Sequence, residues 1–391
     1  MVTLYDVARH AGVSIATVSR VLHGQGPVRE NTRARVRSAI DELGYVPDGA
    51  AQSLARNRKD VIGLVAVEHM GLKPDQYDIE SMSLLFYDAV IRGVELRIRE
   101  KNWALLINFL REEAMPEQEE SVQSRLLALS GKVDGLLIGE GILGPQALAK
   151  LARRLPLVVV AGDTAQRAVD VVSADNWSGA HALVEHLIVD HGRRRLFHIG
   201  GPATAPDAKE RRLAMEAVIE ANPGTKLTGS FTGLFSVVSG REGTLAMLAA
   251  DGELPDALVC ANDQMAIGAL RTLAERGIRV PDDIAVVGFD DIFPASLCDP
   301  PLTTVHQPIR KLAEVACDRL AERINDPTLR PKQELLPTEL VLRSSCGCPP
   351  GTEKRRELRH IARRKPAGAP KSGRPLAGTA GAVPEPLTAE R

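Results

Sequence analysis

Polar side chains come directly after three short apolar runs of this chain. Asn262 ends the run ALVCAN, Asp290 ends IAVVGFD, and Asp163 follows LVVVAG. Ligands of open α/β sheets bind outside the carboxyl ends of the strands, so these residues are candidates for binding. Carboxylates and amides form paired hydrogen bonds with vicinal hydroxyls, which suits a sugar. The alternative for each is a solvated loop residue or a helix cap, and Asn262 and Asp290 are the first candidates.

An alternation of apolar runs and amphipathic stretches would position these residues. Strands are predicted at 61–67, 103–109, 135–140, 157–162, 195–201, 257–262 and 284–290. Helices are predicted at 83–101, 118–130, 145–154, 178–191, 207–221, 238–250 and 263–276. This rhythm predicts parallel α/β sheets with helices on both faces. Roughly 290 residues are more than one sheet usually takes, so two lobes are expected.

The N-terminal run TLYDVARHAGVSIATVSRVL has the pattern of a helix-turn-helix. Thr3 can cap a first helix, and Gly12 supplies a left-handed turn residue. The second helix would present Ile15 and Ala16 outward, with Arg20 one turn later, where a recognition helix reaches base edges. The alternative is two ordinary amphipathic helices in a small bundle.

A third helix at 31–43 would complete a small headpiece, and a short segment at 48–58 follows it. A helix within this segment is too short to be stable in water without packing or a ligand. Leu54 is its only large apolar residue. The segment is therefore either a flexible linker or a hinge helix that folds on DNA and inserts Leu54 into the minor groove.

Charge is divided unevenly along the 391 residues, although the formal net charge is −1. Residues 1–59 carry a net charge of +4, residues 60–348 carry −11, and residues 349–391 carry +6. Positive charge near the N-terminus is expected if that end meets phosphate. Aromatic residues make up only 3%, which argues against broad stacking on single-stranded nucleic acid. The segment 349–391, rich in Pro, Gly, Ala and charge, is predicted to be a disordered basic tail.

The positions of the cysteines and histidines in the sequence suggest no metal site. The five cysteines form no CxxC pair, and we interpret them as reduced thiols of a cytoplasmic protein. His181, His186 and His191 are spaced by five, which turns each by about 140° around an α-helix, so we expect no convergence on a metal.

Enzyme motifs find no support either. No GxGxxG follows a strand, and neither GxxxxGK[ST] nor GxSxG occurs, so we expect no catalytic residues and no cofactor. No signal peptide is recognised, and no apolar run approaches the ~18 residues of a membrane helix. The rival hypothesis is a sugar-binding or sugar-processing α/β protein with an incidental N-terminal helical bundle.

Ordered motifs over about residues 2–345 resemble the lactose and purine repressor (LacI/GalR) family of bacterial regulators. They are the headpiece run, ELGYVP, AAQSLA, VEHL, ANDQMAIGA, DIAVVGFDD and PPLTTVHQP. The resemblance implies an all-α helix-turn-helix headpiece at 1–47, a hinge helix at 48–58 and a two-lobed core at 59–348. That core would be similar to periplasmic sugar-binding proteins, with three crossovers. The resemblance further implies a homodimer that represses from a palindromic operator in double-stranded DNA.

The resemblance also implies individual DNA contacts. Residues expected on the DNA backbone are Tyr5, Ser14, Thr17 and Ser19. Residues expected at base edges are Ile15, Ala16 and Arg20. An arginine suits guanine through paired hydrogen bonds, whereas Ile15 and Ala16 offer only apolar contact. Leu54 matches the minor-groove wedge, and His23 stands where an asparagine is usual.

A small-molecule effector, expected to be a sugar, would bind between the lobes. The residues that match effector positions are Asp163, Arg211, Phe235, Asn262, Asp290 and Gln307. Binding would change the angle between the lobes and thereby the stability of the hinge helices on DNA. Whether the effector strengthens or weakens operator binding is left open. The loop at 69–85 is longer than usual, which affects effector identity. The tail lacks the leucine heptads of a tetramer, so dimers are expected.

Overall fold

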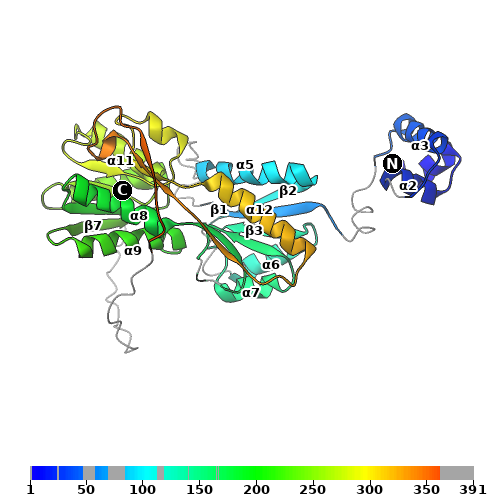
Figure 1. Ribbon diagram of the computed structural model, residues 1–391, viewed down its shortest axis with the longest axis horizontal. Helices are drawn as coiled ribbons and strands as arrows, with labels where there is room; N and C mark the ends of the chain where they lie inside the picture. Colours follow the sequence, from blue (N-terminus) through cyan, green and yellow to red (C-terminus); the bar gives the residue numbers. More distant parts are fainter. Residues whose placement is uncertain are drawn as a thin grey trace, which may run out of the picture. The chain divides into compact units, whose positions relative to one another are not determined.

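The computed structural model describes residues 2–23, 26–46, 58–68, 84–111, 119–139, 141–163, 165 and 167–361 (Figure 1). Leu54 and the rest of the predicted hinge up to residue 57 lie outside the described residues. The same holds for most of the predicted long loop, at 69–83, and for residues 362–391. In the described part of the chain, no helix is long and apolar enough to cross a membrane.

Three short helices form the N-terminal headpiece, as predicted. They are α1 (Leu4–Ala11), α2 (Ile15–His23) and α3 (Glu30–Leu43). Thr3 begins α1 through a capping box: its hydroxyl accepts a hydrogen bond from the Asp6 amide at 3.4 Å, and the Asp6 carboxylate accepts one from the Thr3 amide at 2.9 Å. Gly12, with φ of 60°, then lets the chain turn into α2. Buried Val7, Val18 and other small apolar residues make the core of the headpiece.

The first lobe is built on six parallel strands in the order β11-β5-β4-β3-β1-β2. The strands are β1 (Val61–Glu68), β2 (Ala104–Arg111), β3 (Gly135–Gly139), β4 (Leu157–Val160), β5 (Asp170–Ala174) and β11 (Gln333–Leu336). Helices α5 (Leu84–Lys101) and α12 (Ile309–Asn325) cover one face, and α6 (Glu119–Ser130) and α7 (Pro145–Ala152) cover the other (Figure 1). Strands β3, β4 and β5 are buried along their whole length, as expected for strands covered on both faces.

The second lobe has four parallel strands in the order β7-β6-β8-β9. They are β6 (Arg195–Gly200), β7 (Lys226–Thr232), β8 (Ala257–Cys260) and β9 (Ala285–Val287). Helices α8 (Asn176–Glu185) and α9 (Pro206–Ala221) pack on one face, and α10 (Val237–Ala249) and α11 (Asp263–Glu275) pack on the other. The two lobes therefore have separate hydrophobic cores on each side of two separate sheets.

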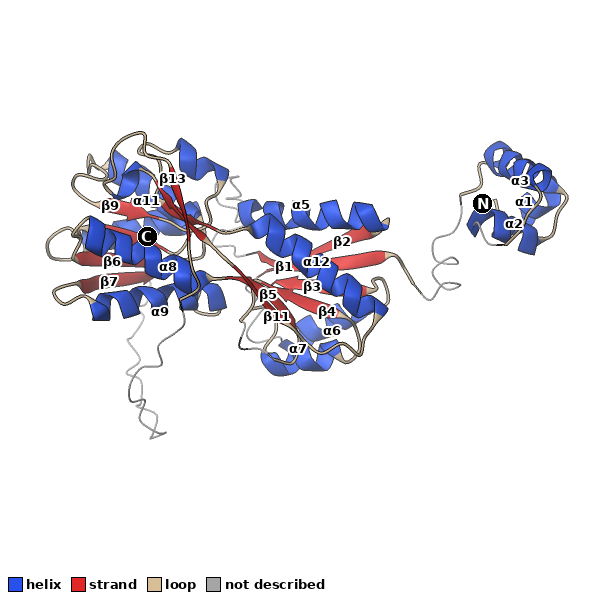
Figure 2. Ribbon diagram, in the orientation of Figure 1, coloured by secondary structure: helices blue, strands red, loops and turns tan. Residues whose placement is uncertain are grey.

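The chain passes between the lobes three times, after β5, after β10 (Thr304–His306) and after β11 (Figure 2). The first and third crossovers touch, because the Asp175 amide donates to the Leu336 carbonyl at 2.8 Å and the Thr338 hydroxyl donates to the Asp175 carbonyl at 3.1 Å. An antiparallel sheet beside the crossovers consists of β10, β12 (Glu339–Leu342) and β13 (Lys354–Glu357). These hydrogen bonds join two of the connections between the lobes.

All seven predicted strands are present, and several further elements were not assigned from the sequence. The edge strand β7 alternates exposed and half-buried residues, which gives a weak signal. Helix α12 has clear helical spacing of buried residues, but it returns to the first lobe after the whole second lobe. Strand β13 corrects the prediction of disorder from residue 349 onward. Its polar residues pair with β12 through the backbone, which composition does not reveal.

Candidate functional sites

The exposed face of α2 carries the side chains expected to read DNA bases. Ala16 and Arg20 are exposed and lie one helical turn apart on the same face. Ile15 is half-buried because it packs against the headpiece core, so only part of its side chain is available to contact DNA. His23 ends α2, and its side chain is outside the described residues.

The residues expected on the DNA backbone come from α1, from α2 and from the cap of α2. Tyr5 is 67% exposed although it is aromatic. Ser14 is exposed, and its hydroxyl accepts a hydrogen bond from the Thr17 amide at 3.3 Å, which confirms that Ser14 caps α2. Ser19 and Thr17 are half-buried. Around the exposed Arg20, α1 and α2 thus offer small polar groups.

In the core, Arg211, Asp290 and Gln307 come together from three distant parts of the chain. Arg211 lies on α9, Asp290 follows β9, and Gln307 follows β10. The Gln307 amide donates to Asp290 Oδ1 at 2.6 Å, and Arg211 Nη1 lies 3.6 Å from the same oxygen. All three residues are at most 6% exposed. The fold therefore brings these three residues into contact.

Asp290 sits in an unfavourable backbone and electrostatic environment. Its φ of 119° is in the region that favours glycine, which costs a non-glycine residue about 1–3 kcal/mol. Burial raises the pKa of its carboxyl to about 7, although Arg211 and the Gln307 hydrogen bond act to lower it. Strain and desolvation of this kind are concentrated at functional sites.

The neighbouring carboxyl of Asp291 behaves in the opposite way. Burial acts to raise its pKa, but hydrogen bonds from His306 and Arg343 outweigh this effect and hold the pKa below its ordinary value. Arg343 Nη2 lies 2.7 Å from Asp291 Oδ1, and Arg355 Nη2 lies 2.7 Å from Oδ2. Asp291 is therefore a paired structural charge.

A cavity of about 580 Å³ reaches Asp290 and Gln307. Its other walls include His306 and, from the first lobe, Asp88 and Arg92 on α5. The cavity is therefore bordered by both lobes and by a crossover. Its size suits a small ligand.

The remaining expected effector residues are placed differently. Asn262 caps α11, because its Oδ1 accepts a hydrogen bond from the Met265 amide at 3.0 Å, and its Nδ2 donates to the Phe235 carbonyl at 3.0 Å. The ring of Phe235 lies against Gly201 and Ala208 in the core of the second lobe. Asp163 is exposed and accepts a hydrogen bond from the Ala165 amide at 2.8 Å. None of the three lines the cavity.

The structure adds residues to this cluster that the sequence did not single out. Arg211 donates through Nε to Asn176 Oδ1 at 2.9 Å and through Nη2 to Asp207 at 3.1 Å. Its guanidinium lies 3.9 Å from the centre of the Phe289 ring. The contact between Asp207 and Arg211 could have been predicted from the sequence, because the two residues lie one helical turn apart. Asn176 and Phe289 come from other elements, so their contacts with Arg211 could not.

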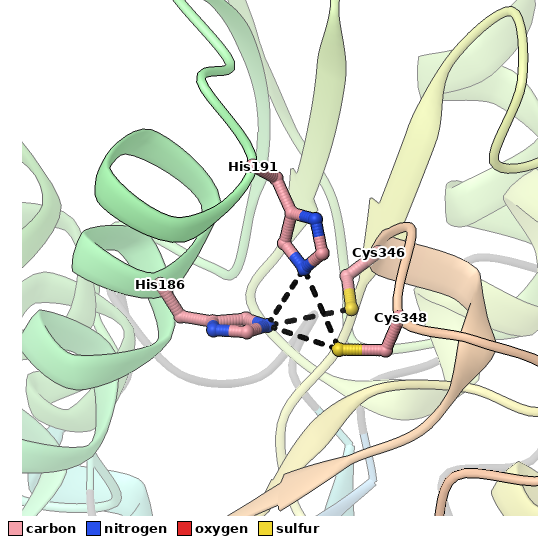
Figure 3. A group of neighbouring side chains, drawn as sticks. All are labelled: His186, His191, Cys346 and Cys348. Atoms are coloured by element: carbon pink, nitrogen blue, oxygen red, sulfur yellow. Dashed lines mark hydrogen bonds between the residues drawn. The ribbon is translucent and has the colours of Figure 1, made fainter.

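The four side chains of His186, His191, Cys346 and Cys348 converge, contrary to the expectation from spacing (Figure 3). That expectation assumed an α-helix through residue 191. Instead, α8 continues into a π-helical turn at His186–Asp190. Its i→i+5 hydrogen bonding brings residues five apart close together, and the two rings lie 4.6 Å apart.

Family models match both parts of the chain. Residues 3–48 match the model of bacterial regulatory proteins of the lacI family, and residues 184–346 match the model of the periplasmic binding protein-like domain. The HTH-type transcriptional regulator DegA of Bacillus subtilis (strain 168) is 33% identical over 352 residues, which cover 88% of this chain and 97% of DegA. The ribose operon repressor of Escherichia coli (strain K12) is 32% identical over 354 residues, which cover 88% of this chain and 100% of that repressor.

Solved structures agree with these matches. The lac repressor dimer bound to operator and the anti-inducer ONPF superposes with a TM-score of 0.76 at 29% identity, covering 88% of this chain and 99% of that one. The complex of the transcriptional regulator CelR with cellobiose gives a TM-score of 0.62 at 30% identity, covering 88% and 100% of the two chains.

A helix-turn-helix headpiece together with a two-lobed, cavity-bearing core defines a DNA-binding regulator that responds to a ligand. The relatives named above are regulators rather than enzymes. The chain belongs to the lacI family of bacterial regulatory proteins, and it is a DNA-binding transcriptional regulator.

Proposed function

We propose that this regulator is a cytoplasmic repressor without enzymatic activity, which binds a palindromic operator as a homodimer. A sugar or sugar derivative in the cavity between its lobes sets its affinity for the operator. The names of relatives support this proposal, since they include a ribose operon repressor, a lac repressor dimer on its operator and a regulator bound to cellobiose.

The division of labour along the chain follows the boundaries expected from the sequence. The headpiece at 1–47 reads DNA, residues 48–58 form a hinge helix on DNA, and 59–348 bind effector and partner. The basic tail predicted at 349–391 would follow, with strand β13 inside its first part. Charge supports the division, because residues 1–59 are net positive while 60–348 are net negative.

Within the headpiece, we assign base contacts to Ala16 and Arg20 and to the exposed part of Ile15. Backbone phosphates would be held by the residues around them, which are Tyr5, Ser14, Thr17, Ser19 and His23. Leu54 would act as the minor-groove wedge of the hinge. The exposure of Ala16 and Arg20 on one face of α2 supports this assignment.

The observation that carries the effector proposal is the buried cluster of Arg211, Asp290 and Gln307, in which Asp290 and Gln307 line the cavity and Arg211 lies behind Asp290. These groups offer a carboxylate, an amide and a guanidinium, which match the donors and acceptors of vicinal hydroxyls. Gln307 lies in a crossover, so a ligand bound to it would contact the segment that must bend when the lobes move. Coupling of ~1–3 kcal/mol would change operator affinity by ~5–150-fold.

A thermal-shift screen of the full-length protein with sugars, polyols and nucleobases tests the proposal. A bound sugar should raise the unfolding midpoint and change the dissociation constant for a symmetrical operator duplex. Asp290→Ala should lose both responses to the ligand and keep operator binding, while Asp251→Ala, at an exposed position of the second lobe, should keep all three. A full ligand response in Asp290→Ala would remove this cluster from the site. A response to nucleobases alone would refute the sugar assignment.

A further inference from the structure

A second cluster, outside the cavity residues, has the composition of a metal site. His186 begins the π-helical turn after α8 and His191 directly follows it, whereas Cys346 and Cys348 come after β12 (Figure 3). The four potential ligand atoms all lie within 4.8 Å of one another. Two thiols and two imidazoles form the ligand set of many structural zinc sites.

Four of the six distances between these atoms are close to those of a tetrahedral zinc site. Zn–N bonds of about 2.0–2.1 Å and Zn–S bonds of about 2.3 Å at tetrahedral angles separate two nitrogens by about 3.4 Å and a nitrogen from a sulfur by about 3.6 Å. The two histidine Nε2 atoms are 3.1 Å apart. The His186 Nε2 lies 3.5 Å from Cys346 Sγ and 3.6 Å from Cys348 Sγ, and the His191 Nε2 lies 3.5 Å from Cys348 Sγ.

A carboxylate orients the more buried histidine. His186 Nδ1 lies 2.7 Å from Asp190 Oδ2, so this nitrogen carries the proton and the Nε2 lone pair faces the sulfurs. Histidines that ligate zinc almost always donate their other ring N–H to such a partner. Asp190 therefore supplies the outer contact that a metal site requires.

The backbone between the cysteines is adapted to bring both thiols to one side. Gly347 has a φ of 115°, and a Cβ at this position would lie 3.1 Å from His191 Nδ1. Only glycine fits this position without strain or displacement of the histidine. The Cys-Gly-Cys spacing is shorter than in most zinc sites, and the left-handed glycine compensates for the missing residue.

The geometry points to a structural zinc site formed by His186, His191, Cys346 and Cys348. Two thiolates would neutralise the ion, so the filled site carries no net charge into its largely buried surroundings. Soft sulfur together with imidazole in tetrahedral arrangement favours Zn²⁺ over Mg²⁺, Ca²⁺ or Mn²⁺. With four protein ligands, the site leaves no position open for a reacting water.

The site would join two segments that are 160 residues apart in the sequence. Because these four ligands come together only in the folded chain, the free energy of zinc binding would add to the stability of the fold. The site would also anchor the third crossover at its end in the second lobe. From this anchor the chain continues through β13 to His360, whose Nδ1 lies 2.6 Å from the Asp175 carboxylate at the first crossover. Zinc would therefore hold the segment that returns to the crossovers.

Metal content provides the first test. Untagged full-length protein, purified under reducing conditions without chelator, should contain one zinc per chain by inductively coupled plasma mass spectrometry. After replacement of zinc by Co²⁺, absorption should show intense d–d bands of tetrahedral cobalt and a thiolate-to-cobalt charge-transfer band. Chelation should lower the unfolding midpoint by several degrees, and added Zn²⁺ should restore it.

Variants locate the metal. Cys348→Ser and His191→Ala, at half-buried positions, should lose the metal and the charge-transfer band, while Cys298→Ser, a half-buried cysteine elsewhere, should retain both. Two measurements on the wild-type protein test the site even if a variant fails to fold. They are the Co²⁺ spectrum and the protection of two thiols from thiol reagents when Zn²⁺ is bound. Less than stoichiometric metal after reconstitution with Zn²⁺ would overturn the proposal. So would unchanged metal content in Cys348→Ser, cobalt without thiolate ligation, or a Cys346–Cys348 disulfide in place of the metal.

Discussion

Replacing Asp290 by asparagine should make the stability of the unliganded protein rise relative to wild type as the pH is raised. Burial raises the pKa of Asp290 to about 7 in the folded protein, against an ordinary value of 3.8. The folded state therefore holds this proton more tightly than the unfolded state. The stability contributed in this way is complete below the unfolded pKa and is lost as pH rises through about 7.

The size of the effect follows from the two pKa values. Between them, stability should fall by about 1.4 kcal/mol per pH unit, and the total over about three units is of the order of 4 kcal/mol. Asparagine has no proton to lose, and its side-chain oxygen can still accept the hydrogen bond from Gln307. Loss of the 3.6 Å ion pair with Arg211 changes the absolute stability, but Arg211 stays charged throughout and adds no slope.

Asp291→Asn is the matched control, with the opposite sign. The pKa of Asp291 is lowered in the folded state, so its contribution is present above the unfolded pKa and is lost as pH falls. Asp291→Asn should therefore destabilise the protein near neutral pH, and the difference from wild type should shrink in acid.

Urea unfolding followed by tryptophan fluorescence measures both effects. The chain has two tryptophans, with Trp103 against the core of the first lobe and Trp177 against that of the second. Trp103→Phe would leave Trp177 to report the lobe that contains Asp290. The free energy of unfolding is compared between pH ~5 and ~8, provided that its slope against urea concentration is the same in the variant and in wild type. A stability difference between Asp290→Asn and wild type that stays constant over this range would refute the reasoning.

Two further changes address DNA reading and assembly. Arg20→Ala should weaken operator binding by about 1–3 kcal/mol, because a paired contact to one base is lost, and should change binding to a random duplex little. Fluorescence anisotropy measures the affinity for both duplexes. Equal losses of affinity for the two duplexes would count against base reading by Arg20. Leu297→Asp should shift the homodimer towards monomer in sedimentation velocity, because Leu297 and nearby Phe293 are 68% and 78% exposed and large exposed apolar groups mark interfaces. Val189→Asp, at a position that is 62% exposed, should leave the dimer intact, and the same dissociation in both variants would argue against this surface.

The sequence by itself determined the features that depend on neighbours along the chain. Thr3 and Asp6 cap each other across three residues, and Gly12 turns the chain, so the headpiece helices could be assigned from types and spacing. Apolar runs located all seven predicted strands, because buried parallel strands need continuous apolar residues. Asp290 could be proposed as a binding residue because strand ends in such folds share an edge, whereas Arg211 and Gln307 were proposed from the family resemblance.

Only the tertiary structure decided which distant segments meet. Asn262 also follows a strand, yet both of its polar groups serve a helix cap and a loop carbonyl, which its position in the sequence does not reveal. The convergence of His186 with Cys346 depends on a π-helical turn and on the third crossover, which brings residues 160 apart into contact. Capping and periodicity act over a few residues, whereas contacts of this kind arise from the path of the whole chain.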